Sequence, residues 1–210
     1  ERKFIPRWQI PTDDRYAVRS RFGVAAEDKL AVWPARLVAA KGIVEFLLAV
    51  PPQALTGWKL LLLGEGPLKE KVQDIVQSRG LEENVVLRSY VGYDEMPGIY
   101  GAADLFLLPS ISDPNPLSVV EAMFAGLPIL VSDRIGNYPE ALHEDVNGWG
   151  FNPYQPDSVL AATCAAFSAP REQIEKMGRQ SRRVAEDFWG SINAIDRFIA
   201  SITVAALSTS

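Results

Sequence analysis

Two carboxylates, Asp113 and Glu121, stand eight positions apart in a segment that follows the apolar run 105–108. Asn115 is a favourable N-cap and Pro116 a favourable first helical residue, so the segment predicts a helix that begins here. Asp113 would lie just before this helix and Glu121 about one turn inside it, so that both carboxylates could border one cleft. The alternative is structural: Asp113 is then a second cap, and Glu121 a favourable charge near a helix N-terminus.

The start of this predicted helix is also a candidate anion site. Amides in the first turn of a helix have no partner inside it, and those of Leu117 and Ser118 would point toward a ligand. Arg36 and Lys41 flank the loop after an earlier apolar run, 30–33. Two cations beside a helix N-terminus would stabilise a diphosphate, which an arginine can bind in a bidentate manner. Taken singly, each would more often be a solvated surface charge.

A glycine pair follows a run of four leucines, in the sequence Gly-Glu-Gly-Pro at 64–67. It resembles half of a dinucleotide-binding fingerprint, but Lys69 takes the place of the third glycine and Arg88, not an acid, follows the next apolar run. A nicotinamide site is therefore a weak interpretation. The structural alternative is a tight turn with Gly66 as N-cap and Pro67 as the first helical residue, and the functional one is a backbone that leaves room for a ligand.

The elements that must position these groups alternate between strand and helix. Short apolar runs bounded by turn residues predict buried strands, and helical spacing of apolar residues predicts the segments between them. The strands are expected at 30–33, 60–63, 85–87, 105–108 and 129–131, the helices at 16–21, 41–50, 68–76, 96–103, 117–124 and 139–142, with helices only from 156 onward. This alternation predicts an α/β fold with a Rossmann-like parallel sheet flanked by helices. Ligands of such sheets lie beyond the carboxyl ends of the strands, where the acids, the cations and the glycine pair are expected.

The bulk composition is that of an ordinary folded protein. The 210 residues suffice for one sizeable core, and 48% of them are hydrophobic and 22% charged. The formal net charge of -5 argues against broad nucleic-acid binding, which needs a basic surface. It leaves room for a small basic pocket that binds one diphosphate.

Single residues add little to the candidate site. Cys164 is the one cysteine and lies in an alanine-rich stretch, so we expect a packed core thiol in a reducing, cytoplasmic compartment. His143, the one histidine, stands beside Glu144 and Asp145 and is expected in solvent rather than as a general base. No signal peptide is recognised, and no apolar run approaches the roughly 18 residues needed to span a bilayer. Peripheral membrane contact stays open.

Several short motifs follow one another in a characteristic order and spacing between about Leu30 and Ile202. They are Arg36 with Lys41-Gly42, Gly64-Glu65-Gly66-Pro67, Asp113 with Glu121-Ala122-Met123, Ala125-Gly126-Leu127-Pro128, Ser132-Asp133, Pro139-Glu140 and Asn147-Gly148. Together they resemble the C-terminal domain of family-4 glycosyltransferases with the GT-B fold. No single motif decides this resemblance, which depends on the whole set.

The resemblance implies binding of a nucleotide-diphosphate sugar (a UDP-, GDP- or ADP-sugar) for retaining hexosyl transfer to an unknown acceptor. Asp113 would face the sugar hydroxyls, Glu121 the ribose hydroxyls, and Arg36 and Lys41 the diphosphate; these four are the expected catalytic-site residues. Main-chain groups between Arg88 and Val91 would border the base. The remaining donor contacts are expected at Gly64, Gly66, Asn115, Leu117 and Ser118.

This sequence departs from the family pattern at a few positions. Asp113 replaces the usual glutamate, and Ala35 replaces a frequent glycine before the arginine. Pro114 and Pro116 stand where glycines are common and remove two amide donors. No D-x-D motif is present to hold a divalent metal, so fixed cations would take the metal's electrostatic role, and transfer is expected to be metal-independent.

The resemblance also implies a domain division. We expect an interdomain linker with a leading helix at 1–29, the donor-binding domain at 30–189 and a crossover helix at 190–210. The family's first, acceptor-binding domain is missing here, so the isolated chain is expected to be inactive. That missing domain would be the partner of exposed apolar residues such as Trp8, Trp189 or Phe198, and the place of any peripheral membrane contact.

Two other functions stay open at this point. A sugar-nucleotide epimerase shares the GT-B architecture, but it would need further acid-base residues. A non-catalytic nucleotide-sugar-binding or partner-docking module would need only part of the site. Neither the base of the donor nor the acceptor can be read from the sequence.

Overall fold

The computed structural model describes residue 4 and residues 6–190, without the side chain of Trp8. The predicted crossover helix at 190–210, with Phe198, therefore lies outside the described residues apart from Gly190. A short 3-10 helix, η1 (Arg7–Gln9), and helix α1 (Thr12–Arg21) precede the first strand. From there to Phe151, strands and helices alternate.

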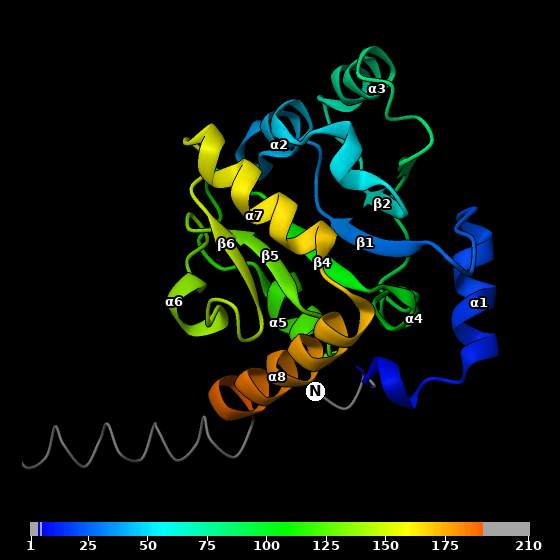
Figure 1. Cartoon of the computed structure of the whole chain (residues 1–210), viewed down its shortest axis with the longest axis vertical. Coiled ribbons are helices and arrows are strands. Elements are labelled where there is room, and N and C mark those ends of the chain that lie inside the picture. Colours follow the sequence, from blue (N-terminus) through cyan, green and yellow to red (C-terminus); the bar gives the residue numbers. More distant parts are fainter. Residues whose placement is uncertain (1–3, 5, 191–210) are drawn as a thin grey trace, which may run out of the picture.

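Six parallel strands form one sheet in the order β3-β2-β1-β4-β5-β6 (Figure 1). They are β1 (Lys29–Pro34), β2 (Trp58–Leu63), β3 (Val85–Arg88), β4 (Leu105–Leu108), β5 (Ile129–Ser132) and β6 (Gly148–Phe151). The strand order reverses direction between β1 and β4. In open parallel sheets, this switch point is where a ligand crevice forms. The predicted Rossmann-like α/β fold is confirmed.

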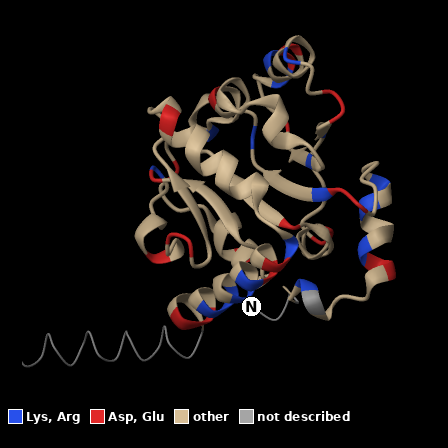
Figure 2. Ribbon diagram, viewed as in Figure 1, with Lys and Arg blue, Asp and Glu red and all other residues tan. Residues whose placement is uncertain are grey.

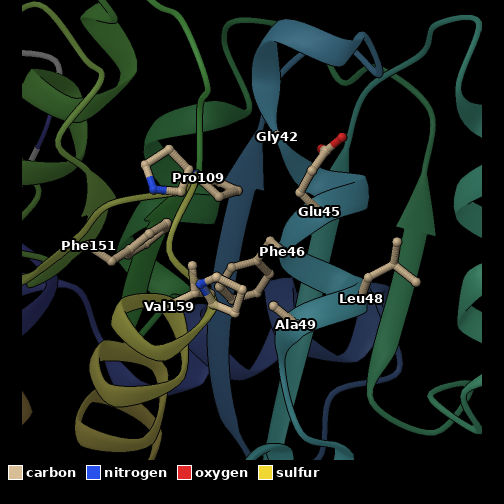
Figure 3. A pocket seen from close by; sticks show the side chains of 10 residues that line it. Gly42, Glu45, Phe46, Leu48, Ala49, Pro109, Phe151 and Val159 are labelled. Carbon is tan, nitrogen blue, oxygen red and sulfur yellow. The ribbon is translucent and has the colours of Figure 1, made fainter.

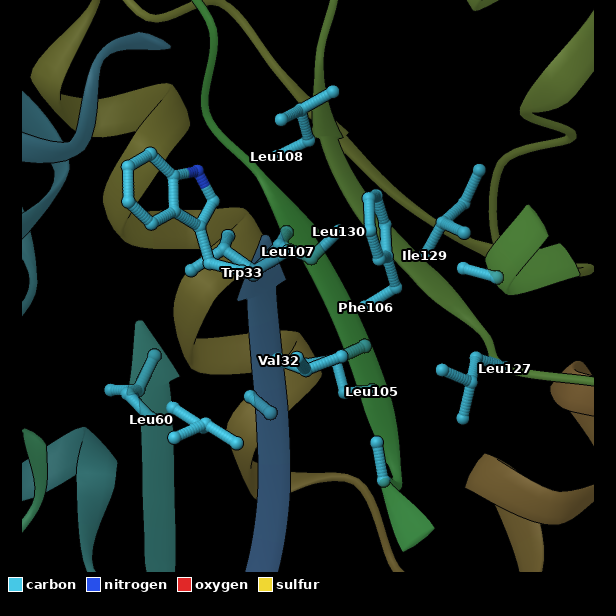
Figure 4. Close-up of a cluster of buried hydrophobic side chains, with 14 of the residues drawn as sticks. Val32, Trp33, Leu60, Leu105, Phe106, Leu107, Leu108, Leu127, Ile129 and Leu130 are labelled. Carbon is cyan, nitrogen blue, oxygen red and sulfur yellow. The ribbon is translucent and has the colours of Figure 1, made fainter. Parts of the chain in front are cut away.

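The centre of the sheet is buried on both faces, which explains why its strands are continuous apolar runs. Leu60, Leu61 and Leu62 are fully buried, as are all four residues of β4 to within 1%. Figure 4 shows side chains of β1, β2, β4 and β5 packed together in this core. All five predicted strands are present in the sheet, which confirms these predictions.

Strand β6 was not predicted; its sequence is Gly-Trp-Gly-Phe, and glycine is uncommon within strands. Glycine is needed at positions 148 and 150 because atoms of neighbouring residues occupy the space that a Cβ would take. A Cβ on Gly148 would lie 2.0 Å from the carbonyl oxygen of Ile129, and a Cβ on Gly150 would lie 2.6 Å from the hydroxyl of Tyr138. Close packing, rather than turn formation, selects glycine at this edge of the sheet.

Helices cover both faces of the sheet. Helix α2 packs against both α3 and α7, while α8 crosses α5 and α6, and α1 lies along α4 (Figure 1). The bounds are α2 (Ile43–Ala49), α3 (Lys69–Ser78), α4 (Met96–Ala102), α5 (Leu117–Phe124), α6 (Tyr138–Ala141), α7 (Pro156–Ser168) and α8 (Arg171–Trp189), with further 3-10 turns η2 (Ala39–Lys41) and η3 (Pro52–Leu55). Among the described residues, none of these helices combines the length and apolarity that crossing a membrane requires.

Three local predictions were wrong. Helix α5 begins at Leu117 with Pro116 at the N-cap position, so Asn115 caps nothing. Helix α3 begins after Leu68, so Gly66 is not its N-cap and Pro67 not its first residue. Cys164 is exposed, because α7 turns Val159, Thr163 and Ala166 inward and leaves Cys164 on its outer side.

Candidate functional site

The loops after β1 and β4 are tied together at the switch point. The carbonyl oxygen of Ala40 accepts hydrogen bonds from the amides of Ile111 (2.9 Å) and Ser112 (3.1 Å). Gly42 has a φ of +66°, and a Cβ there would lie only 1.9 Å from the carbonyl oxygen of Pro109. Glycine is therefore required for this approach. The result is that the two loops carrying the predicted cations and acids lie side by side.

Lys41 and Asp113 form an ion pair with each other across these loops. Asp113 is 8% exposed, and its main chain is held from the other side because the amide of Gly136 donates to its carbonyl oxygen at 2.8 Å. The structure thus brings together two residues that the sequence assigned to different parts of a ligand. Each one fixes the position of the other, and Lys41 remains partly exposed toward the loop surface.

Glu121 receives hydrogen bonds from two tyrosines. The hydroxyl of Tyr93 donates to Oε1 at 3.2 Å, and that of Tyr100 donates to Oε2 at 3.3 Å. Burial, followed by the charge of Glu121, raises the pKa of Tyr100 well above 10, so this hydroxyl keeps its proton and remains a donor. The charge of Glu121 also raises the pKa of Tyr93. The carboxylate is therefore held in one orientation.

A cavity of about 380 Å³ opens between Glu121 and the ends of β1 and β2. Two predicted donor-site residues with charge, Arg36 and Glu121, line it together with the predicted Gly64, Val91 and Ser118. The rest of the wall is formed by Pro34, Ala35, Leu63, Glu65, Tyr90, Tyr93, Met96 and Tyr100. An aromatic and apolar wall with a few charged groups at defined places is typical of a small-molecule site.

The glycine pair shapes this cavity through loop packing. A Cβ on Gly64 would lie 2.0 Å from the carbonyl oxygen of Ala35, and one on Gly66 would lie 2.3 Å from that of Leu37. The loop after β2 is thereby pressed against the loop after β1. Neither of the two readings made from the sequence, a helix cap or space left for a ligand, described this loop-to-loop contact.

The other predicted residues lie around the cavity rather than in its wall. Leu117 is 65% exposed at the start of α5, and within the described chain its amide and that of Ser118 have no hydrogen-bond partner. Asn115 is exposed in the loop before them. The guanidinium of Arg88 donates to the carbonyl of Leu87 at 3.0 Å and does not line the cavity, while the main-chain carbonyl oxygen of Arg88 accepts from the amide of Gly64.

Sequence reasoning missed Tyr93 and Tyr100 as site residues. Tyr100 was assigned to the apolar face of a helix, which is correct for its ring but not for its hydroxyl. A tyrosine on a buried face needs a partner for its hydroxyl, and that requirement was the available signal. Nothing in the spacing pointed to Tyr93, which reaches Glu121 from the loop before α4. His143 is exposed, as expected.

A second cavity, of about 330 Å³, lies on the other side of Gly42 between α2 and α7 (Figure 3). Its wall is mostly apolar, formed by side chains such as Phe46, Phe151 and Val159. Glu45 is the one charged residue that lines it. A wall whose described residues include no cation is poorly suited to a diphosphate, so the cavity beside Glu121 is the better candidate.

Comparison with known proteins agrees with the fold. An uncharacterized glycosyltransferase of Methanocaldococcus jannaschii is 31% identical over 149 residues, which cover 70% of this chain and 38% of that protein. The Anabaena protein HepE, solved in complex with UDP, superposes with a TM-score of 0.78 at 19% identity over 96% of this chain and 56% of its own. The C-terminal domain of a glycosyl transferase group 1 family protein (LpcC) from Francisella tularensis gives 0.73 at 18% identity, over 89% of this chain and 99% of its own.

The chain spans between 38% and 52% of the length of the curated relatives it matches. Its sheet and flanking helices match those of GT-B glycosyltransferase structures. The family model described as "Glycosyl transferases group 1" matches residues 14–184, which include every strand of the sheet and both loops of the candidate site. The chain therefore belongs to the group 1 glycosyltransferases.

Proposed function

We propose that this chain is the donor-binding half of a retaining family-4 glycosyltransferase, and that the cavity beside Glu121 binds a nucleotide-diphosphate sugar. The observation that carries the proposal is the arrangement of Glu121. Its carboxylate is oriented by two tyrosine hydroxyls, and it lies in the same cavity as Arg36 and the start of α5. A carboxylate fixed in this way can accept hydrogen bonds from a pair of ribose hydroxyls.

The diphosphate would lie between Arg36 and the first turn of α5. Arg36 forms no ion pair with the described residues, so its guanidinium is available for a phosphate. The unpartnered amides of Leu117 and Ser118 add the partial positive charge of a helix N-terminus. Breaking the bond between sugar and diphosphate puts negative charge on the leaving group, and these fixed groups would stabilise that charge.

Lys41 and Asp113 would act as a pair at the sugar end of the donor. The carboxylate of Asp113 would accept hydrogen bonds from sugar hydroxyls, and the ammonium group of Lys41, which the ion pair holds in place, would lie near the diphosphate. The base would lie toward Tyr90 and Val91, where the wall is aromatic and apolar. The acceptor would be bound by a further domain, which agrees with the share of the relatives that this chain spans.

The proposal is tested by thermal unfolding with UDP, GDP and ADP, each with and without EDTA. A nucleotide present at about one hundred times its dissociation constant stabilises a protein by about 2.7 kcal/mol. For a chain of this size we expect the melting temperature to rise by roughly 5–11 °C with at least one nucleotide. Since Arg36, Lys41 and the helix amides supply the positive charge, EDTA should leave this rise unchanged.

Three outcomes decide the question. A rise that survives EDTA supports a donor site that needs no metal. A rise that EDTA abolishes keeps the nucleotide site but overturns metal-independent binding. No rise with any of the three nucleotides at millimolar concentration contradicts the donor site itself.

A further inference from the structure

Asp104 is a buried carboxylate at the amino-terminal end of the central strand β4. The donor cavity lies at the opposite, carboxyl-terminal end of the strands. Its side chain forms ion pairs with Arg7 and Arg19 and lies 3.7 Å from Arg15. The amide of Leu30 also donates to it, at 2.8 Å. Among the described residues, one acid therefore faces three arginines, so positive charge is in excess.

The excess positive charge borders a small cavity of about 140 Å³. This cavity is lined by Arg7 from η1, Arg15 from α1, and Glu175 and Arg179 from α8. Figure 2 shows basic positions of η1 and α8 near one another at this end of the molecule. Of the described residues, Glu175 is the one acid in the wall, and it is paired with Arg179 at 3.7 Å on the exposed rim.

Two donors at this cavity are buried without a hydrogen-bond partner in the described part of the chain. They are Nη1 of Arg7, whose side chain is 7% exposed, and Nε of Arg15. A buried charged donor without a partner is costly, so it normally has an acceptor. Burial, followed by the charge of Arg7, lowers the pKa of Arg15 to about 10.

We propose that this arginine cavity binds a tetrahedral oxyanion, the phosphate group of inorganic phosphate or of a small phosphate monoester. Guanidinium groups match the geometry of phosphate oxygens and can bind them in a bidentate manner. A single water needs a share of about 30 Å³, so a cavity of 140 Å³ has room for a phosphate group. An ester substituent would extend over the exposed rim formed by Arg179 and Glu175.

This site is separate from the donor cavity. The sheet lies between them, because Asp104 and Leu30 are at the amino ends of their strands and Pro34 lines the donor cavity at the carboxyl end. The four residue steps of strand from Leu30 to Pro34 correspond to roughly 13 Å. An anion bound here would also join η1 and α1 to α8, and it would therefore stabilise the packing of these three helices.

The experiment is a thermal titration of the 210-residue chain with inorganic phosphate, and separately with glycerol phosphate, at constant ionic strength set with chloride. The test variant is Arg15→Met with Arg179→Met, which leaves the pairs of Asp104 with Arg7 and Arg19 intact. The matched control is Arg183→Met, an exposed arginine on α8 that does not line the cavity. A second control, Arg36→Met, alters the donor cavity instead.

We expect a saturable rise in melting temperature with phosphate in the wild type and in both controls. In the double variant the apparent affinity should be at least tenfold weaker. An equal effect of both phosphate compounds identifies the phosphate group alone as the ligand, and a stronger effect of the monoester identifies an ester as the ligand. No rise in the wild type, or a rise that Arg36→Met removes and the double variant keeps, overturns the proposal.

Discussion

Replacing Asp104 by asparagine is expected to lower the free energy of unfolding by about 3–5 kcal/mol, the usual cost of removing one partner of a buried ion pair. Arg7 and Arg19 would remain buried with no opposite charge between them. Urea unfolding followed by circular dichroism measures the change. The matched control is Asp28→Asn, whose carboxylate lies 4.0 Å from Lys59 and is more exposed, so its effect should stay below about 1 kcal/mol.

The same pair predicts how stability depends on pH. Burial acts to raise the pKa of Asp104, but the charges of Arg7 and Arg19 outweigh it and hold the pKa below its usual value. A carboxyl whose pKa is lower in the folded state contributes stability above its unfolded pKa, about 3.9, and loses that contribution as pH falls through the folded pKa. Wild-type stability should therefore fall more steeply below pH 4 than that of Asp104→Asn. Equal slopes, or a cost below 1 kcal/mol at pH 7, would show that Asp104 does not hold these arginines.

Glu121→Ala is expected to weaken nucleotide binding by roughly ten- to one-hundredfold, because charge-assisted hydrogen bonds contribute about 1.5–3 kcal/mol. Isothermal titration calorimetry with the nucleotide that stabilises the chain most gives the affinity. Removing the carboxylate also leaves the buried hydroxyl of Tyr100 without its acceptor. Some loss of stability is therefore expected as well, and the unfolding temperature without ligand must be measured alongside.

Glu45→Ala is the matched control for this change. Glu45 is an exposed glutamate that lines the neighbouring cavity between α2 and α7 (Figure 3). Its removal should leave nucleotide affinity within about twofold of the wild type. Unchanged affinity in Glu121→Ala with reduced stability would show that Glu121 is a structural charge near a helix start. Lost affinity in Glu45→Ala would move the site to the other cavity.

Most of the sheet can be predicted from the sequence because buried parallel strands consist of short runs of apolar residues. The bounds of β4 agree with the prediction to the residue, and α5 spans the predicted 117–124, although Pro116 is its N-cap and not its first residue. The prediction failed where packing decides the residue type. Gly148 and Gly150 were not recognised as strand residues, because the close neighbours that require glycine there come from Ile129 and Tyr138.

Several residues of the candidate site could be predicted from the sequence, but the contacts between their side chains could not. The strand order places Arg36 and Glu121 at the carboxyl-terminal ends of neighbouring strands, so their shared cavity follows from the fold. The ion pair of Lys41 with Asp113 joins residues 72 positions apart, and it depends on the way in which Gly42 packs against Pro109. No local pattern contains that information. The same is true of the arginines around Asp104, which come from segments more than 80 positions away.

The location of the bound nucleotide tests the central claim most directly. Backbone amide resonances of the ¹⁵N-labelled chain can be followed while UDP, GDP or ADP is added. The donor-site proposal predicts shifts at Gly64, Val91, Leu117 and Ser118, around the cavity that contains Glu121. The amide resonances of η1, α1 and the middle of α8 should not shift. Shifts confined to η1, α1 and α8, or to the cavity beside Glu45, would contradict the assignment of the donor site.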